Sequence, residues 1–151
     1  MMSDIRELYQ QVILDHGRKP RCLGVMSNPT LMKQGFNPLC GDRLTLYIQA
    51  SEGKITDVSF DGDGCAISMA SASLMAEAIK GMSIEEAEEL FELFHQMVMQ
   101  PNTSIDEEAL GKLIVLKGVT EYPARVKCAT LAWQTLRAAI QGDQQPVSTE
   151  S

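Results

Sequence analysis

The sequence has few positive charges and no long hydrophobic run. Lysine and arginine number 13 against 20 aspartate and glutamate residues, so the formal net charge is −7 at pH 7. Because phosphate binding needs clustered cationic side chains, we expect no nucleic-acid partner. No apolar run approaches the roughly 20 residues needed to cross a bilayer, and we therefore expect no membrane segment.

A secretion signal is also lacking at the start of the sequence. Residues 1–12 read MMSDIRELYQQV, with acidic side chains where a signal peptide has a basic and then an apolar stretch. We therefore expect a cytoplasmic protein whose thiols stay reduced, without disulfides. Its four cysteines are Cys22, Cys40, Cys65 and Cys128. They suit buried small apolar side chains, metal ligands or reactive thiols, and composition does not choose among these.

The pattern of apolar and turn residues predicts one α+β domain over residues 1–141 and a polar, disordered tail at 142–151. We expect a small antiparallel sheet of about three strands, covered by five to six α-helices. Ser83 followed by Glu86 is typical of a capping box, and Pro123 suits the first turn of a last helix. The expected strands lie at 30–35, 43–49 and 54–61, and the clearest helices at 4–15, 66–81, 83–99, 105–116 and 123–140.

Three cysteines and one aspartate lie at the ends of these elements. Cys40 precedes one strand of a predicted hairpin and Cys65 follows the other, so antiparallel pairing brings them to the same edge of the sheet. Asp42 shares the side-chain direction of Cys40 if this segment is extended. Cys128 would join them if the start of the last helix docks there, and the helix N-terminus would favour its thiolate. Three thiolates and one carboxylate suit a four-coordinate zinc site.

The spacing of these residues alone is not that of a zinc finger. It leaves inert buried cysteines and a metal or reactive site about equally supported. Other candidates have simpler interpretations: Cys22 is incidental, His16 ends a helix and bonds to backbone, and His95 lies on a solvated helix face. Arg125 and Lys127 flank the last cysteine and suit either a solvated helix surface or contact with an anionic group or a partner protein.

Three motifs surround the cysteines in order: NPLCGD (37–42), GDGCAISMASASLM (62–75) and RVKCATLAW (125–133). Together they resemble the SufU/IscU family (NifU N-terminal-like) of iron–sulfur cluster assembly proteins. The segment LDHGRKPRCLG (14–24) also resembles the N-terminal loop of that family. The resemblance spans roughly residues 4–140 and implies a SufE/NifU-like fold.

The family has two branches that differ beside the last cysteine. IscU-type proteins are scaffolds for a [2Fe–2S] cluster and carry a histidine immediately before that cysteine, where this chain has Lys127. Lysine is a poor ligand at neutral pH because its amine is protonated. The long segment between Cys65 and Cys128, with a predicted helix inside it, resembles the SufU branch.

The SufU resemblance implies a zinc-dependent sulfurtransferase. Such a protein accepts persulfide sulfur from a SufS-type, PLP-dependent cysteine desulfurase and passes it to a downstream iron–sulfur assembly scaffold. Carried over residue by residue, Cys40, Asp42, Cys65 and Cys128 would bind Zn²⁺, and Cys40 would be the catalytic sulfur acceptor, freed when a desulfurase histidine replaces it on zinc. Two alternatives stay open: a [2Fe–2S] scaffold on the same ligands, and a folded adaptor whose zinc is purely structural.

Overall fold

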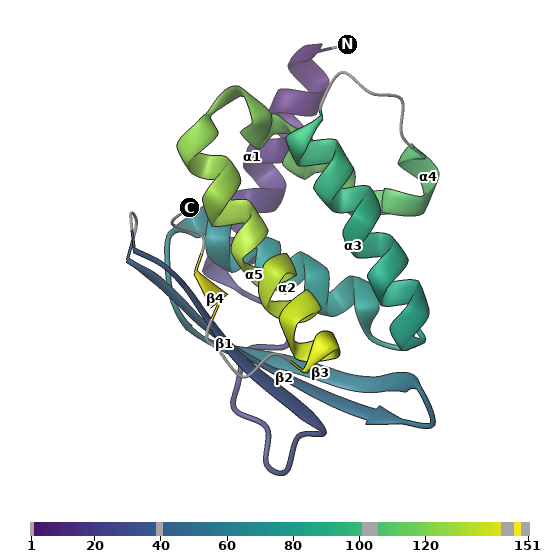
Figure 1. Ribbon diagram of the computed structural model, residues 1–151. Coiled ribbons are helices and arrows are strands. Elements are labelled where there is room, and N and C mark those ends of the chain that lie inside the picture. The colour runs from purple at the N-terminus through teal and green to yellow at the C-terminus, as the bar shows by residue number, and fades with distance from the viewer. Residues whose placement is uncertain (1, 39–40, 101–105, 143–146, 149–151) are drawn as a thin grey trace.

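The computed structural model describes residues 2–38, 41–100, 106–142 and 147–148. A β-sheet forms one layer, and the helices are stacked on one of its faces (Figure 1). The antiparallel strands are β1 (Leu31–Asn37), β2 (Asp42–Ser51) and β3 (Lys54–Asp63). The helices are α1 (Met2–Arg18), α2 (Ala66–Ile79), α3 (Ile84–Met99), α4 (Glu107–Leu110), the 3₁₀-helix η1 (Gly111–Glu121) and α5 (Pro123–Gln141). The predicted α+β class with a three-stranded antiparallel sheet is confirmed.

Strand β2 lies in the middle of the antiparallel sheet and pairs with β1 on one side and β3 on the other. Its inward side chains, Leu44, Leu46 and Ile48, are buried beneath the helices, as period-two alternation requires. The turn to β3 places Glu52 and Gly53 at positive φ, the backbone that a two-residue hairpin turn needs. The hairpin therefore returns the chain to the edge where β2 began.

A short fourth strand extends the sheet. Val147–Ser148 (β4) pairs in parallel with Gly35 and Phe36 of β1, giving the order β3-β2-β1-β4. The sequence predicts disorder over 142–151, so the structure differs from that prediction at these two residues. β4 therefore covers the edge of β1 at Gly35 and Phe36, where backbone N–H and C=O groups would otherwise be unpaired.

Helices α2 and α5 pack directly against the sheet and against each other. The small side chains of α2 permit this close approach, because Ala70, Ser71, Ala72 and Ser73 are all buried. On the sheet side, a Cβ at Gly35 would overlap Thr135 of α5. Glycine is therefore required where α5 crosses β1. The remaining helices form an outer layer over these two.

Helix α5 carries the only tryptophan of the chain into the core. Trp133 is fully buried and stacks on Phe94 of α3, with 4.4 Å between ring centroids. Its Nε1 donates to Ser71 Oγ at 3.2 Å, and that hydroxyl donates to the Ala129 carbonyl at 2.6 Å. These contacts fix α5 against α2 and α3.

Among the described helices, α5 included, none has the length and apolar character that would span a bilayer.

The capping box of α3 forms as predicted, with Ser83 and Glu86 bonding reciprocally.

The segment before α5 differs from the predicted helix at 105–116. Asp106 then caps the four-residue α4, which ends at Gly111 with φ +54°. This backbone conformation interrupts the α-helix, and the chain continues as η1. Residue 105 itself lies outside the described residues.

Candidate metal centre

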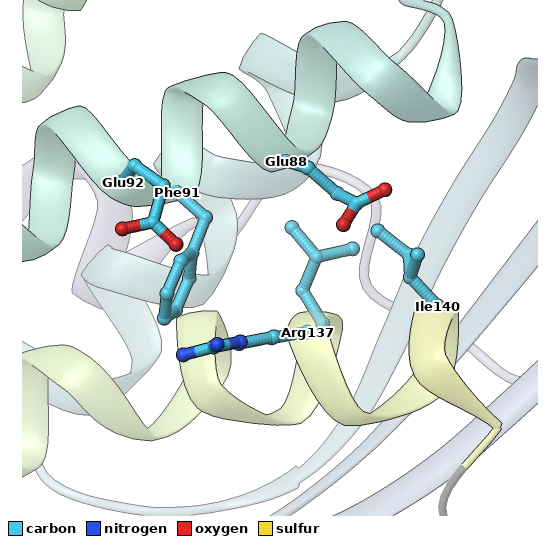
Figure 2. Close-up of a pocket in the computed structure, with 6 residues that line it drawn as sticks. Glu88, Phe91, Glu92, Arg137 and Ile140 are labelled. Carbon is cyan, nitrogen blue, oxygen red and sulfur yellow. The ribbon is translucent and has the colours of Figure 1, made fainter.

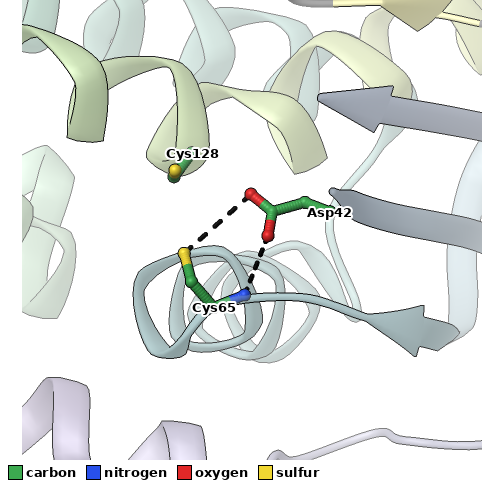
Figure 3. Close-up of side chains that lie close together, drawn as sticks. All are labelled: Asp42, Cys65 and Cys128. Carbon is green, nitrogen blue, oxygen red and sulfur yellow. Dashed lines mark hydrogen bonds between the residues drawn. The ribbon is translucent and has the colours of Figure 1, made fainter. Parts of the chain in front are cut away.

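Three of the four predicted metal ligands converge at one edge of the sheet. Asp42 begins β2, Cys65 immediately precedes α2, and Cys128 lies in the second turn of α5. One ligand atom from each residue lies within 4.8 Å of the other two (Figure 3). Asp42 and Cys128 are buried, and Cys65 is half-buried. The fourth predicted ligand, Cys40, lies outside the described residues.

Asp42 is held by the backbone that follows β3. Its Oδ1 accepts the N–H of Cys65 at 2.8 Å, and its Oδ2 accepts from the Cys65 thiol, with 3.9 Å between Oδ2 and Sγ. Gly64 makes room for this carboxylate, because a Cβ there would lie 2.9 Å from Asp42 Oδ1. The hairpin therefore brings Asp42 and Cys65 together at one edge of the sheet. Gly64, which precedes Cys65, has no side chain to collide with the Asp42 carboxylate.

Cys65 is the N-cap of α2. Its extended backbone precedes the helix, and its Sγ accepts the N–H of Ser68 at 3.4 Å. An N–H donor and the positive end of the helix dipole both stabilise negative charge on this sulfur. The sequence predicts this helix-terminus effect for Cys128, whereas the structure places it at Cys65.

Cys128 is contacted from two sides. Its Sγ accepts a hydrogen bond from Asn37 Nδ2 at 3.6 Å and lies 3.7 Å from the carbonyl of Ala124, to which the thiol donates. Asn37 ends β1 and is fully buried. Sequence reasoning did not single out Asn37, although it opens the NPLCGD motif. The signal that could have identified Asn37 is a polar residue at an inward-facing strand position, close in sequence to the predicted ligands Cys40 and Asp42.

The donor set fits a tetrahedral metal ion. With Zn–S bonds of about 2.3 Å and Zn–O bonds of about 2.1 Å, tetrahedral ligand atoms lie about 3.6–3.8 Å apart. The three side chains need to close by only about 1 Å to reach that separation, since their ligand atoms already lie within 4.8 Å of one another. Thiolate ligands select zinc or iron–sulfur centres over the hard cations magnesium and calcium. The three residues thus provide most of a zinc site and leave one position for a further ligand.

Both histidines of the chain lie elsewhere. His16 is buried at the end of α1, and its Nδ1 lies 2.7 Å from the hydroxyl of Ser73, so its partner is a side chain and not the predicted backbone group. Burial, followed by the nearby Arg21 cation, lowers the pKa of His16. His95 stacks on Phe91 with 5.6 Å between ring centroids. Neither imidazole belongs to the described group of Asp and Cys side chains.

Cys22 also lies away from this group. It adopts φ +62° in the loop after α1, and its carbonyl accepts the N–H of Phe60 in β3 at 3.0 Å. Its side chain is half-buried, and burial raises the pKa of the Cys22 thiol. Near Cys128, the exposed Arg125 guanidinium lies 4.4 Å from the ring centroid of Tyr122, and Lys127 is half-buried.

A shallow pocket lies between α3 and the C-terminal half of α5 (Figure 2). Its Arg137 guanidinium lies 5.2 Å from the Phe91 ring centroid. Cys128 is in the opposite half of α5, so the pocket is separate from the metal ligands. Its lining residues are Glu88, Phe91, Glu92, Leu136, Arg137 and Ile140.

Comparisons with known proteins identify the family of this chain. The NifU-like N terminal domain family matches residues 8–129, which include Asp42, Cys65 and Cys128. The zinc-dependent sulfurtransferase SufU of Bacillus subtilis (strain 168) is 43% identical over 138 residues, covering 91% of this chain and 92% of that protein. The iron–sulfur cluster assembly scaffold protein IscU of Streptococcus pyogenes serotype M1 is 40% identical over 139 residues, covering 92% and 86%.

A solved structure shows the same fold. The crystal structure of FiSufU from Fervidobacterium islandicum AW-1 superposes with a TM-score of 0.83 at 38% identity, covering 89% of this chain and 98% of that one. The family match spans β1, β2, β3, α2 and the start of α5. This chain therefore belongs to the NifU-like N-terminal domain family of iron–sulfur cluster assembly proteins.

Proposed function

We propose that this protein is a zinc-dependent sulfurtransferase. It accepts persulfide sulfur from a PLP-dependent cysteine desulfurase and passes it to a downstream iron–sulfur assembly scaffold. The observation that carries the proposal is the convergence of Asp42, Cys65 and Cys128 within 4.8 Å. Similarity to the SufU of Bacillus subtilis, named a zinc-dependent sulfurtransferase, supports it.

In this proposal Asp42, Cys65 and Cys128 hold Zn²⁺, and Cys40 supplies the remaining ligand. When bound, the ion keeps the coordinating thiols deprotonated and protects them from oxidation. The chain's own groups hold the ligands in place: the N–H of Cys65 bonds to Asp42, and the N–H of Ser68 bonds to the sulfur of Cys65. Cys40 directly precedes Gly41, whose backbone has φ +72°.

The transfer is a thiolate exchange. The Cys40 thiolate attacks the outer sulfur of the persulfide on the desulfurase cysteine, and a new S–S bond forms at Cys40. The S–S bond of the donor persulfide breaks, and the desulfurase cysteine leaves as a thiolate. No oxidant or reductant is needed, because one persulfide is consumed and one is formed.

The positions of the two histidines favour zinc over a cluster with histidine ligation. His16 is bonded to Ser73 and His95 is stacked on Phe91, and Lys127 precedes the last cysteine. The second candidate function is a [2Fe–2S] scaffold on the same ligands. The 40% identity to the IscU scaffold protein of Streptococcus pyogenes favours it.

Metal analysis combined with desulfurase turnover tests the proposal. We expect purified wild-type protein to be colourless with about one zinc per chain and to accelerate a cysteine desulfurase in the presence of a thiol reductant. Cys40→Ala abolishes that acceleration, whereas the matched control Cys22→Ala retains it. A brown protein with iron–thiolate absorption supports the scaffold instead. Full acceleration by Cys40→Ala contradicts the proposed acceptor.

A further inference from the structure

We propose that Asn37 is a positioning residue for the metal centre. Its side-chain amide donates to Cys128 Sγ, aims this sulfur at the ion and stabilises the metal-bound thiolate. This inference rests on the metal site of the proposed function. It assigns a role to a residue that is not itself a ligand.

The position of Asn37 follows from the strand register. In the antiparallel β1–β2 pair Asn37 lies directly opposite Asp42, and both side chains are fully buried on the helix side of the sheet. Asp42 engages Cys65, while Asn37 Nδ2 lies 3.6 Å from Cys128 Sγ, a normal length for a hydrogen bond to sulfur. Asp42 therefore contacts Cys65, which is the N-cap of α2, and its cross-strand neighbour Asn37 contacts Cys128 of α5.

The charge of the loaded site makes such a donor necessary. Zn²⁺ with three thiolates and one carboxylate has a formal charge of −2, and Asp42 and Cys128 are buried. Burying net charge is costly unless hydrogen bonds compensate it. The N–H of Cys65 donates to Asp42 Oδ1, and the N–H of Ser68 donates to Cys65 Sγ. The Asn37 amide supplies the corresponding donor at Cys128.

The contacts that Cys128 makes with Asn37 and Ala124 differ in what they can do for a thiolate. A neutral thiol donates to the Ala124 carbonyl, which lies 3.7 Å from the sulfur. A metal-bound thiolate has no proton to donate, so that carbonyl offers it no hydrogen bond. The Asn37 N–H can still donate, and its bond strengthens when the acceptor is charged. Asn37 therefore favours the metal-bound state over the free thiol.

Asn37→Asp tests the role with a side chain of nearly the same size. It places a carboxylate where the thiolate needs a donor. We expect zinc affinity, measured by competition with a chromophoric chelator, to fall about 10–100-fold, as is typical for outer partners of metal ligands. The charge-matched control is Gln34→Glu on the exposed face of β1, which leaves affinity unchanged. Asn37→Ser, which is too short to reach Cys128, gives the same weakening without adding charge and replaces Asn37→Asp if the latter does not fold.

Cobalt spectra and paired melting curves separate positioning from a merely structural role. We expect the thiolate-to-cobalt charge-transfer band of Co²⁺-loaded Asn37→Ser to shift, and the Tm increment on metal loading to shrink. Equal Tm losses in the metal-free and loaded states, with unchanged affinity and cobalt spectrum, overturn the inference. Failure of wild-type protein to bind zinc or cobalt contradicts the metal centre itself. That outcome is distinguishable, because it does not depend on Asn37.

Discussion

Asp42 and Cys65 are joined by a 2.8 Å hydrogen bond between the carboxylate Oδ1 and the backbone N–H. The bond links the start of β2 to the N-cap of α2, and the two residues also offer ligand atoms to the same site. One carboxylate therefore performs two tasks. It orders the loop that presents Cys65, and its second oxygen faces the sulfur of that residue at 3.9 Å. Substitution at position 42 should separate these tasks.

Asp42→Asn retains an oxygen that accepts the Cys65 N–H but removes the charge. We expect the metal-free variant to melt close to wild type while its zinc affinity falls. Asp42→Ala also leaves the Cys65 N–H without this acceptor, and it should lower the free energy of unfolding by a further ~1–3 kcal/mol. Chelator competition and chemical denaturation measure the two effects. Equal stability of the two variants, with wild-type zinc affinity in both, would contradict the double role.

Gly64→Ala should displace the Asp42 carboxylate by steric overlap. The new Cβ would lie 2.9 Å from Asp42 Oδ1 and 3.2 Å from Ser68 Oγ, so the carboxylate must move. We expect a loss of zinc affinity that exceeds the loss of stability in the metal-free protein. Gly17→Ala is the matched control, because its Cβ would meet Ala66 of α2 at 3.3 Å without touching the carboxylate. Similar affinity losses in both variants would argue against a specific effect on Asp42.

His16 should make stability depend on pH. Burial lowers its pKa in the folded protein, whereas the unfolded chain takes up a proton near pH 6.5. The contribution of the neutral, Ser73-bonded imidazole is therefore fully present above about pH 6.5 and is lost as pH falls toward the lower folded value. Unfolding free energies between about pH 8 and pH 5 should show a slope that His16→Gln flattens. His95→Gln is the control, and loss of the slope in that variant instead would refute the assignment.

Ser71→Ala should destabilise the fold without touching the metal ligands. It removes the acceptor of Trp133 Nε1, which is fully buried, so we expect a loss of about 1–3 kcal/mol in unfolding free energy. Trp133 fluorescence reports both the unfolding transition and the changed surroundings of the ring. Zinc affinity should remain that of wild type. A large affinity loss would mean that the Ser71 contacts between α2 and α5 also position Cys65 and Cys128.

Local sequence signals predicted much of this fold. The hairpin follows from alternation around a glycine-containing turn, α3 from the Ser83–Glu86 capping box, and α5 from Pro123 with apolar residues three and four positions apart. Each of these signals involves residues close in sequence, so the element can be predicted without knowing its tertiary contacts.

Features set by distant contacts were not predictable in this way. Strand β4 exists through pairing with the edge of β1, and the 3₁₀ geometry of η1 follows an interruption at Gly111. At the site, hairpin geometry placed Asp42 beside Cys65, whereas the contact between Asn37 and Cys128 joins residues 91 positions apart. No periodicity or motif spacing encodes such a contact.

X-ray absorption at the zinc edge tests the shared metal site most directly. We predict about one zinc per chain, with about three sulfur ligands near 2.3 Å and one oxygen ligand near 2.1 Å. Cys65→Ser and Cys128→Ser should each remove one sulfur from the zinc shell or abolish binding. Zinc bound mainly by nitrogen and oxygen, and unaffected by either serine variant, would contradict the account.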